Sequence, residues 1–271
     1  MIAGGAPEPC PEHVFLRTQE PRATSAAFGT LGSCLRRSTM VAMALALAAC
    51  DGSTPLFQHD AKEPGPFPAA DRPVANIVSP RWSSEEARDR LNEAGAVMDR
   101  SGITPGMTVA DIGAGEGYYT IRLAARVGKD GRVLAEDIVP EVRDALAQRV
   151  ARERLDNVSV RLGEPANPKL PDNSFDRVFM VHMYHEIQQP YEFLWRMRPS
   201  LRPNGLVVVV DANRPTQNHG TPPTLLKCEF GAIGYTQVAM QDMPSAGGYL
   251  AMFRATGPRP APAAIKPCKR G

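Results

Sequence analysis

The sequence predicts an α/β fold in which a mostly parallel sheet carries helices on both faces. Strand-like and helix-like segments alternate five times between residues 108 and 211, and this order is typical of such sheets. Residues 206–210, LVVVV, are apolar throughout, as expected of a central strand that is buried on both faces. With 271 residues, of which 43% are hydrophobic and 22% charged, the chain can form one such domain with flanking segments.

Local signals place the individual elements. Ser83-Ser-Glu-Glu86 is a capping box that opens an amphipathic helix, and Pro105-Gly106 turns the chain into the first strand. A Pro-Ser-Ala-Gly turn joins the last two strands. We expect helices at residues 83–100, 118–127, 140–154, 191–198 and 221–233, and strands at residues 108–112, 132–137, 157–162, 175–181, 206–211, 235–242 and 248–256.

The first strand runs directly into a glycine turn, Gly113-Ala-Gly-Glu-Gly117. Alternate glycines leave no Cβ between the backbone and a ligand, and they permit positive φ in a tight strand-to-helix reversal. The next helix points its free N–H groups at that ligand. The turn therefore predicts a nucleotide site. The dinucleotide fingerprint is not matched, because Tyr118 stands where its last glycine is required.

Asp111 followed by the glycine turn resembles the first motif of the class I, Rossmann-like, S-adenosylmethionine-dependent methyltransferases, an acidic residue followed by G-x-G-x-G. The stretch LPDNSFD at residues 170–176 is also similar to this family, and the last two strands resemble its antiparallel sixth and seventh strands. The resemblance covers residues 81–256. It implies a Rossmann-like seven-stranded, mostly parallel sheet with helices on both faces and an antiparallel C-terminal hairpin.

The resemblance implies S-adenosylmethionine as the cofactor. Asp137, at the end of the second strand, would accept both ribose hydroxyls, with Glu136 pointing to the other face; alternatively the two acids form a solvated or capping pair. Glu164 replaces the family's aspartate that meets the adenine amino group. Tyr118 could approach the sulfonium as a cation–π partner or pack in the core. The expected cofactor residues are Asp111, Gly113, Gly115, Gly117, Tyr118, Asp137 and Glu164.

His182-Met-Tyr-His-Glu186 follows the fourth strand and resembles the family segment that faces both cofactor and acceptor. Tyr184, His185 and Glu186 are therefore candidates for holding the acceptor or removing its proton. The alternative is that His182 and His185 are structural and bind backbone carbonyls. Methyl transfer depends mainly on positioning and exclusion of water, so the absence of an obvious catalytic dyad is no objection, and the sequence does not name the acceptor.

The predicted function is methyl transfer from S-adenosylmethionine to a small-molecule acceptor. The 31 Lys and Arg residues nearly balance the 29 Asp and Glu residues, which predicts no nucleic-acid partner. Parts of the sequence resemble quinone-ring methylating enzymes, and the GEGYYT turn with a signal sequence looks most like predicted bacterial methyltransferases of unknown substrate. An arsenite methyltransferase is not expected, because it would need clustered thiols. The alternatives are a non-catalytic, membrane-tethered nucleotide-binding module and an NAD(P)-dependent oxidoreductase.

The segments before the domain predict export. Residues 1–34 lack periodicity and are expected to be a non-native or disordered extension, with the native start near Leu35. Residues 35–50 contain arginines, then an apolar run of about ten residues, and then a lipobox-like LAAC. The apolar run is too short to span a membrane permanently. Together these features predict a signal peptide. Cys50 would carry the lipid anchor of an inner-membrane lipoprotein facing the periplasm. If the signal is not used, the protein is cytoplasmic.

Pro-rich segments flank the expected domain, residues 79–256. Residues 51–78 are expected to be a linker, and residues 257–271 a disordered tail. Cys228 and Cys268 remain after the export signal, and they are either free thiols or a disulfide. We expect free thiols, because Cys268 lies in the tail. No cysteine spacing suggests zinc, so no metal site is predicted.

Overall fold

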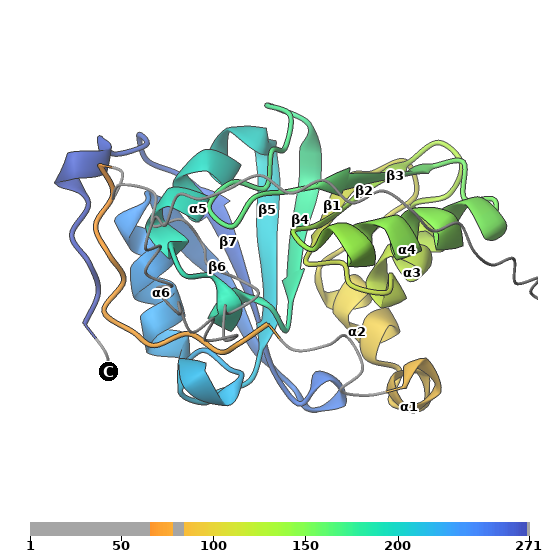
Figure 1. Ribbon diagram of the computed structural model, residues 1–271, viewed down its shortest axis with the longest axis horizontal. Coiled ribbons are helices and arrows are strands. Elements are labelled where there is room, and N and C mark those ends of the chain that lie inside the picture. Colours follow the sequence, from red (N-terminus) through yellow and green to blue (C-terminus); the bar gives the residue numbers. More distant parts are fainter. Residues whose placement is uncertain (1–65, 78–83, 270–271) are drawn as a thin grey trace, which may run out of the picture. The chain divides into compact units, whose positions relative to one another are not determined.

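The computed structural model describes residues 66–77 and 84–269 (Figure 1). These residues belong to one of the two units into which the chain divides, residues 58–271. The predicted extension, the signal peptide with Cys50 and the first part of the linker lie outside the described residues. Of the described helices, none has the length and apolar composition that crossing a bilayer requires.

Seven strands form one sheet, and they are β1 (Thr108–Ile112), β2 (Arg132–Asp137), β3 (Val158–Leu162), β4 (Phe175–Val181), β5 (Leu201–Asp211), β6 (Tyr235–Met243) and β7 (Gly248–Ala255). Their order is β3-β2-β1-β4-β5-β7-β6. Strands β1 to β5 run parallel, whereas β7 is antiparallel to both of its neighbours. This confirms the predicted mostly parallel sheet with its antiparallel C-terminal hairpin.

The direction in which strands are added reverses beside β1. The chain moves from β1 through β2 to β3 on one side, and then returns to place β4 and β5 on the other. At such a reversal the connections leave neighbouring strands in opposite directions and open a crevice at the carboxyl ends, where ligands of α/β sheets bind. The glycine turn after β1 lies at this position.

The helices are α1 (Glu85–Arg90), α2 (Glu93–Arg100), α3 (Tyr118–Val127), α4 (Pro140–Arg152), α5 (Pro190–Met197) and α6 (Pro223–Ala232). Short 3-10 helices are η1 (Tyr184–Glu186), η2 (Arg198–Ser200), η3 (Thr216–Asn218), η4 (Pro244–Ala246) and η5 (Pro262–Ala264). The single helix expected over residues 83–100 is split into α1 and α2, because Asn92 between them has a left-handed backbone with φ of 50°.

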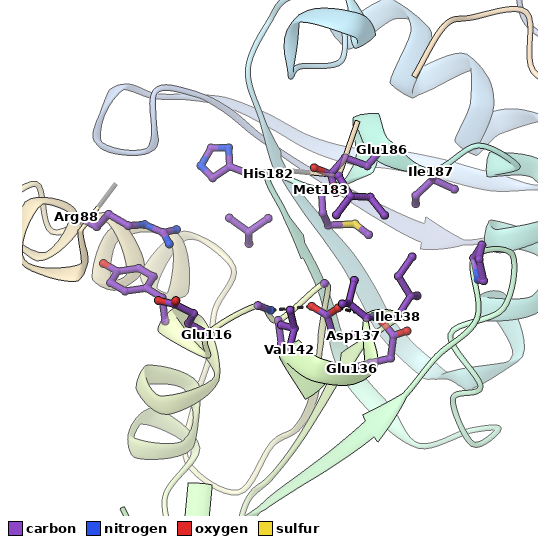
Figure 2. A pocket seen from close by; sticks show the side chains of 18 of the residues that line it. Arg88, Glu116, Glu136, Asp137, Ile138, Val142, His182, Met183, Glu186 and Ile187 are labelled. Atoms are coloured by element: carbon purple, nitrogen blue, oxygen red, sulfur yellow. Dashed lines mark hydrogen bonds between the residues drawn. The ribbon is translucent and has the colours of Figure 1, made fainter. Parts of the chain in front are cut away.

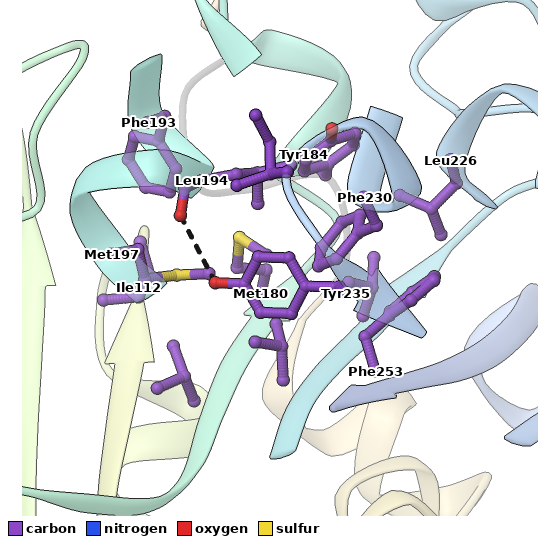
Figure 3. Packing of buried hydrophobic residues seen from close by; sticks show 14 of the residues in the cluster. Ile112, Met180, Tyr184, Phe193, Leu194, Met197, Leu226, Phe230, Tyr235 and Phe253 are labelled. Carbon is purple, nitrogen blue, oxygen red and sulfur yellow. Dashed lines mark hydrogen bonds between the residues drawn. The ribbon is translucent and has the colours of Figure 1, made fainter. Parts of the chain in front are cut away.

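Helices cover both faces of the sheet (Figure 1). Val207 and Val209 of β5 belong to the hydrophobic cluster under α5 and α6, whereas Val208 and Val210 belong to the cluster under α2 and α3. Figure 3 shows part of the first cluster, in which aromatic rings from α6, β6 and β7 pack together. The all-apolar sequence of β5 is thus explained by burial on both faces, as expected.

Residues 66–77 pack on the domain, although they were expected to belong to a linker. The side chain of Arg72 is 1% exposed and forms an ion pair with Glu229 of α6 at 2.8 Å. Its Nη2 also donates to the carbonyl of Ile187 at 3.2 Å. The predicted domain start at residue 79 is therefore wrong, since the folded unit includes residues 66–77.

The C-terminal segment is also ordered by specific contacts through Lys269, so the predicted disordered tail is wrong over the described residues. Ile265 joins the hydrophobic cluster under α5 and α6, and the backbone N–H of Cys268 donates to Tyr191 Oη at 2.6 Å. Cys268 and Cys228 form a disulfide with Cα atoms 6.0 Å apart. The expectation of two free thiols is therefore wrong as well, because the tail returns to α6.

Candidate active site

A cavity of about 900 Å³ lies at the carboxyl ends of β1, β2 and β4 (Figure 2). Its walls come from the glycine turn, the end of β2, the segment after β4 and the region of α1. Figure 2 shows Glu136 and Asp137 on one side, and His182, Met183 and Glu186 opposite them. The volume falls within the roughly 300–1,000 Å³ of small-molecule sites.

The glycine turn needs glycine for two independent reasons. Gly113 and Gly117 have φ of +65° and +90°, a region that side chains disfavour. A Cβ on Gly113 would stand 3.0 Å from Met183, and one on Gly117 would stand 2.4 Å from Leu146. The chain can therefore make this reversal beside the cavity only without side chains at these positions.

Asp137 is held by the backbone around the cavity. Its Oδ2 accepts a hydrogen bond from Gly115 N at 3.0 Å, and its Oδ1 accepts one from Val139 N at 2.9 Å. Burial raises the pKa of Asp137, and these backbone donors oppose that rise. Each carboxylate oxygen retains capacity for a further donor. The glycine turn thus fixes the carboxylate in an orientation from which it can bind a ligand.

Glu136 also lines the cavity, although it was not among the predicted cofactor residues. It pairs in register with Ile112. Because successive side chains of a strand point to opposite faces, Glu136 lies on the opposite face of the sheet from Asp137, as expected. Its Oε1 is buried without a hydrogen-bond partner among the described residues, and burial raises its pKa to about 8. Gly163 makes room for it, since a Cβ there would come within 1.5 Å of Oε1.

Three of the predicted cofactor residues, Asp111, Gly117 and Glu164, are not among those that line the cavity. Asp111 is buried beneath the turn, where Oδ2 accepts from Thr120 Oγ1 at 2.7 Å, and burial raises its pKa to about 6. Glu164 is half exposed and forms an ion pair with Lys169 at 2.7 Å. Asp111 therefore supports the glycine turn, whereas the structure does not bring Glu164 to the other site residues.

Tyr118 lines the cavity, but its ring already contacts cations. The guanidinium carbons of Arg88 and Arg122 each lie 3.8 Å from the ring centroid, and Tyr118 Oη donates to Asp89 at 3.0 Å. Tyr118 is therefore the cation–π partner of two arginines in this structure. Arg88, which also lines the cavity, had no sequence signal beyond its place in a charged helix.

Of the three predicted catalytic residues, only Glu186 lines the cavity. Tyr184 is fully buried and donates to Glu229 at 2.7 Å. His185 is buried with Nδ1 at 3.0 Å and 3.2 Å from the two oxygens of Asp211. The structural alternative thus describes His185 better, although its partner is a carboxylate instead of a backbone carbonyl.

His182 lines the cavity in place of His185. It follows β4 with a left-handed φ of 54°, and its Nε2 lies 3.7 Å from Glu93 Oε1. Glu93 accepts two hydrogen bonds from Arg88, at 2.9 Å and 2.6 Å. Although burial opposes it, hydrogen bonding from Arg88 and the nearby His182 imidazole lower the pKa of Glu93 to about 2. An imidazole beside a permanent carboxylate can bind or accept a proton from a ligand.

Residues 109–205 match the family model described as a methyltransferase domain. Arsenite methyltransferase of Halobacterium salinarum is 33% identical over 137 residues, which cover 48% of this chain and 34% of that protein. The ubiquinone/menaquinone biosynthesis C-methyltransferase UbiE of Hahella chejuensis is 32% identical over 126 residues, covering 44% of this chain and 48% of that protein. The chain thus spans half or less of the length of these relatives.

Solved structures share the fold. A SAM-dependent methyltransferase from Aquifex aeolicus superposes with a TM-score of 0.54 at 23% identity, covering 63% of this chain and 97% of that chain. The cyclase SpnF superposes with a TM-score of 0.52 at 19% identity, covering 68% and 69%. The family match marks residues 109–205 as a methyltransferase domain, and the solved structures share its fold. That a cyclase shares the fold means that the reaction must be argued from the site.

Proposed function

We propose that this protein transfers a methyl group from S-adenosylmethionine to a small-molecule acceptor. The observation that carries the proposal is Asp137, whose carboxylate is bonded to Gly115 of the glycine turn and lines a cavity of about 900 Å³. When bound, the cofactor supplies a methyl group already activated by its sulfonium. The protein then has to bind the cofactor, orient the acceptor and exclude water.

The cofactor side of the cavity is assigned to the glycine turn and the end of β2. Asp137 would accept the two ribose hydroxyls, because its two oxygens match two neighbouring donors. Gly113 and Gly115 line the cavity, and they would leave the backbone bare beside the ligand. Glu136, protonated near neutral pH because its pKa is about 8, offers both a donor and an acceptor to a neutral heterocycle.

The acceptor side is assigned to the segment after β4. His182, Met183 and Glu186 line the wall opposite Asp137, so an acceptor would meet an imidazole, a thioether and a carboxylate. The names of the relatives include arsenite and quinone methyltransferases. Cys228 and Cys268 are joined in a disulfide and cannot bind arsenic as thiolates, which favours an organic acceptor.

Calorimetric titration tests the proposal. S-adenosylmethionine and NAD⁺ are titrated separately into the wild type, Asp137→Ala and the control Asp156→Ala, which removes an exposed aspartate outside the cavity. We expect micromolar binding of S-adenosylmethionine, weakened by about 2–3 kcal/mol, or roughly 30- to 150-fold, in Asp137→Ala only. Binding of NAD⁺ instead would support an oxidoreductase. Binding of neither would leave a non-catalytic module and refute the enzyme.

We further propose that the protein is exported and anchored at the inner membrane through a lipid on Cys50. The signal-like sequence of residues 35–50 supports this, and so does the Cys228–Cys268 disulfide, because disulfides persist in oxidising compartments. Cell fractionation with lipid labelling of the wild type and Cys50→Ala tests the proposal. A cytosolic, unlabelled wild type, or peptides from residues 1–34 in the mature protein, would contradict it.

A further inference from the structure

We propose that His185, Glu186 and His219 form a binding site for a divalent transition-metal ion, with Zn²⁺ as the best match. One ligand atom from each residue lies within 4.8 Å of the other two. Two imidazoles and one carboxylate are donors that Zn²⁺ and similar ions take in proteins. The residues come from two loops at the same edge of the sheet: η1 follows β4, and His219 ends η3, which follows β5.

His185 is oriented as a metal-binding histidine would be. Its Nδ1 donates to Asp211, so that Nε2 is the nitrogen that points away from this carboxylate. Asp211 is itself fixed, because it accepts hydrogen bonds from Thr221 Oγ1 at 2.7 Å and from Ala212 N at 2.8 Å. Histidines that bind metals usually donate their other N–H to a carboxylate in this way, which sets the tautomer and the ring direction.

Residues 66–77 hold the two loops together. Ala75 N donates to the carbonyl of His185 at 3.3 Å, and Arg72 Nη2 donates to the carbonyl of Ile187 at 3.2 Å. On the other loop, Thr216 Oγ1 donates to the carbonyl of Pro73. The ligands are therefore brought together by the fold, which reduces the entropy that binding an ion would cost.

Charge and access are compatible with an ion. Glu186 and Asp211 together carry two formal negative charges next to the two imidazoles. His185 is buried, whereas Glu186 and His219 are partly exposed and leave a route from solvent. Zinc bonds of about 2.0–2.1 Å place tetrahedral ligand atoms about 3.3 Å apart, so ligand atoms that now lie within 4.8 Å of one another would approach by up to about 1.5 Å through side-chain rotation to close the site around an ion.

The competing explanation is simple packing of the two rings. The rings of His185 and His219 meet edge to face, with centroids 5.5 Å apart and an interplanar angle of 87°. Such contacts also occur between rings that bind nothing. The ring packing does not explain why a carboxylate lies at the same point, and metal titration separates the two explanations.

Glu186 also lines the cavity, so an ion held there would face the acceptor side. This second step rests on the proposed function. An open coordination position would favour acceptors that carry an oxygen donor, such as a hydroxyl group, because a bound cation lowers the pKa of that hydroxyl.

The test uses the full chain without a histidine tag, stripped by a chelator and titrated with Zn²⁺ by calorimetry and with Co²⁺ by visible absorption. The variants are His219→Ala and the near-isosteric Glu186→Gln. The controls are His182→Ala and Glu116→Gln, which change the same residue types on the cavity wall outside the ligand set. Circular dichroism checks the fold of each variant, and Glu186→Gln keeps the test valid if His219→Ala does not fold.

We expect one ion per wild-type chain, retained by both controls and weakened in His219→Ala and Glu186→Gln by more than about tenfold. No Zn²⁺ binding in the micromolar range by the wild type, equal affinity in His219→Ala, or equal losses in the controls would overturn the metal site. The same proteins are titrated with S-adenosylmethionine. Cofactor binding without metal binding would refute only the metal site, and the reverse would refute only the proposed enzyme.

Discussion

Replacing Glu136 by glutamine should make the stability of the protein less sensitive to pH. Glu136 is 1% exposed, and its Oε1 has no hydrogen-bond partner among the described residues. Burial raises its pKa from 4.5 to about 8. Between these values the folded protein keeps the proton, whereas the unfolded chain releases it. The stabilisation is therefore complete below the lower pKa and is lost as the pH rises to the higher one.

The expected magnitude follows from linkage. Within the window, each pH unit lowers the free energy of unfolding by up to about 1.4 kcal/mol. From pH 5.5 to pH 7.5 the wild type should lose about 2.5 kcal/mol relative to Glu136→Gln, because glutamine does not titrate. For a domain of this size that difference corresponds to about 5–10 °C in melting temperature. Asp111 also titrates near this range, with a pKa of about 6, but its contribution cancels in the comparison.

The assay is urea or thermal unfolding of the wild type, Glu136→Gln and Glu141→Gln at several pH values across that window. Glu141 is exposed, so its substitution reports the effect of removing one surface carboxyl. Any constant offset between wild type and Glu136→Gln reflects packing and does not matter. Parallel stability profiles for these two proteins would refute the reasoning, since they would mean that Glu136 does not gain a proton on folding.

Two further predictions concern the segments that pack around α6. Cys228→Ser should lower the free energy of unfolding by about 4 kcal/mol in the chain-entropy model for a disulfide that spans a sequence separation of 40. The same urea midpoint for Cys228→Ser and the oxidised wild type would contradict this. Arg72→Ala should cost about 3–5 kcal/mol, because it leaves the buried Glu229 without its ion partner. Adding Glu229→Gln should recover part of that loss, and a double variant no more stable than Arg72→Ala would contradict the pairing.

The sheet was predictable because its signals are local. Residues 132–137 and 175–181 were predicted as strands, and β2 and β4 have these same bounds. Both have an apolar centre, VLA in one and VFMV in the other, and turn residues precede them, and such signals need no knowledge of distant contacts. β5 begins at Leu201, earlier than predicted, because Leu201 already pairs with Phe175 of β4, and the pairing resumes at Leu206 after a register shift between Phe175 and Arg177.

The Pro-rich segments were not predictable from composition. The small number of apolar residues in these segments predicted disorder. A few side chains are nevertheless enough to hold a segment on the domain when each one binds a specific partner. Arg72 reaches Glu229, and Cys268 reaches Cys228, and both of these partners lie on α6. Composition indicates how much surface a segment can bury on average. It contains no information about which distant side chain the segment will contact.

The segment after β4 shows how far a motif can assign a site. The position of this segment in the sequence predicted that it lies at the cavity. It did not predict which of its side chains face the cavity. His182 leaves β4 with a left-handed backbone, and the 3-10 turn that follows directs Tyr184 toward Glu229 and His185 toward Asp211. The cavity receives His182 and Glu186 instead. Because the local backbone after β4 decides which side chains face the cavity, residues near a strand end can be nominated from sequence, but their roles have to be assigned from the turn that orients them.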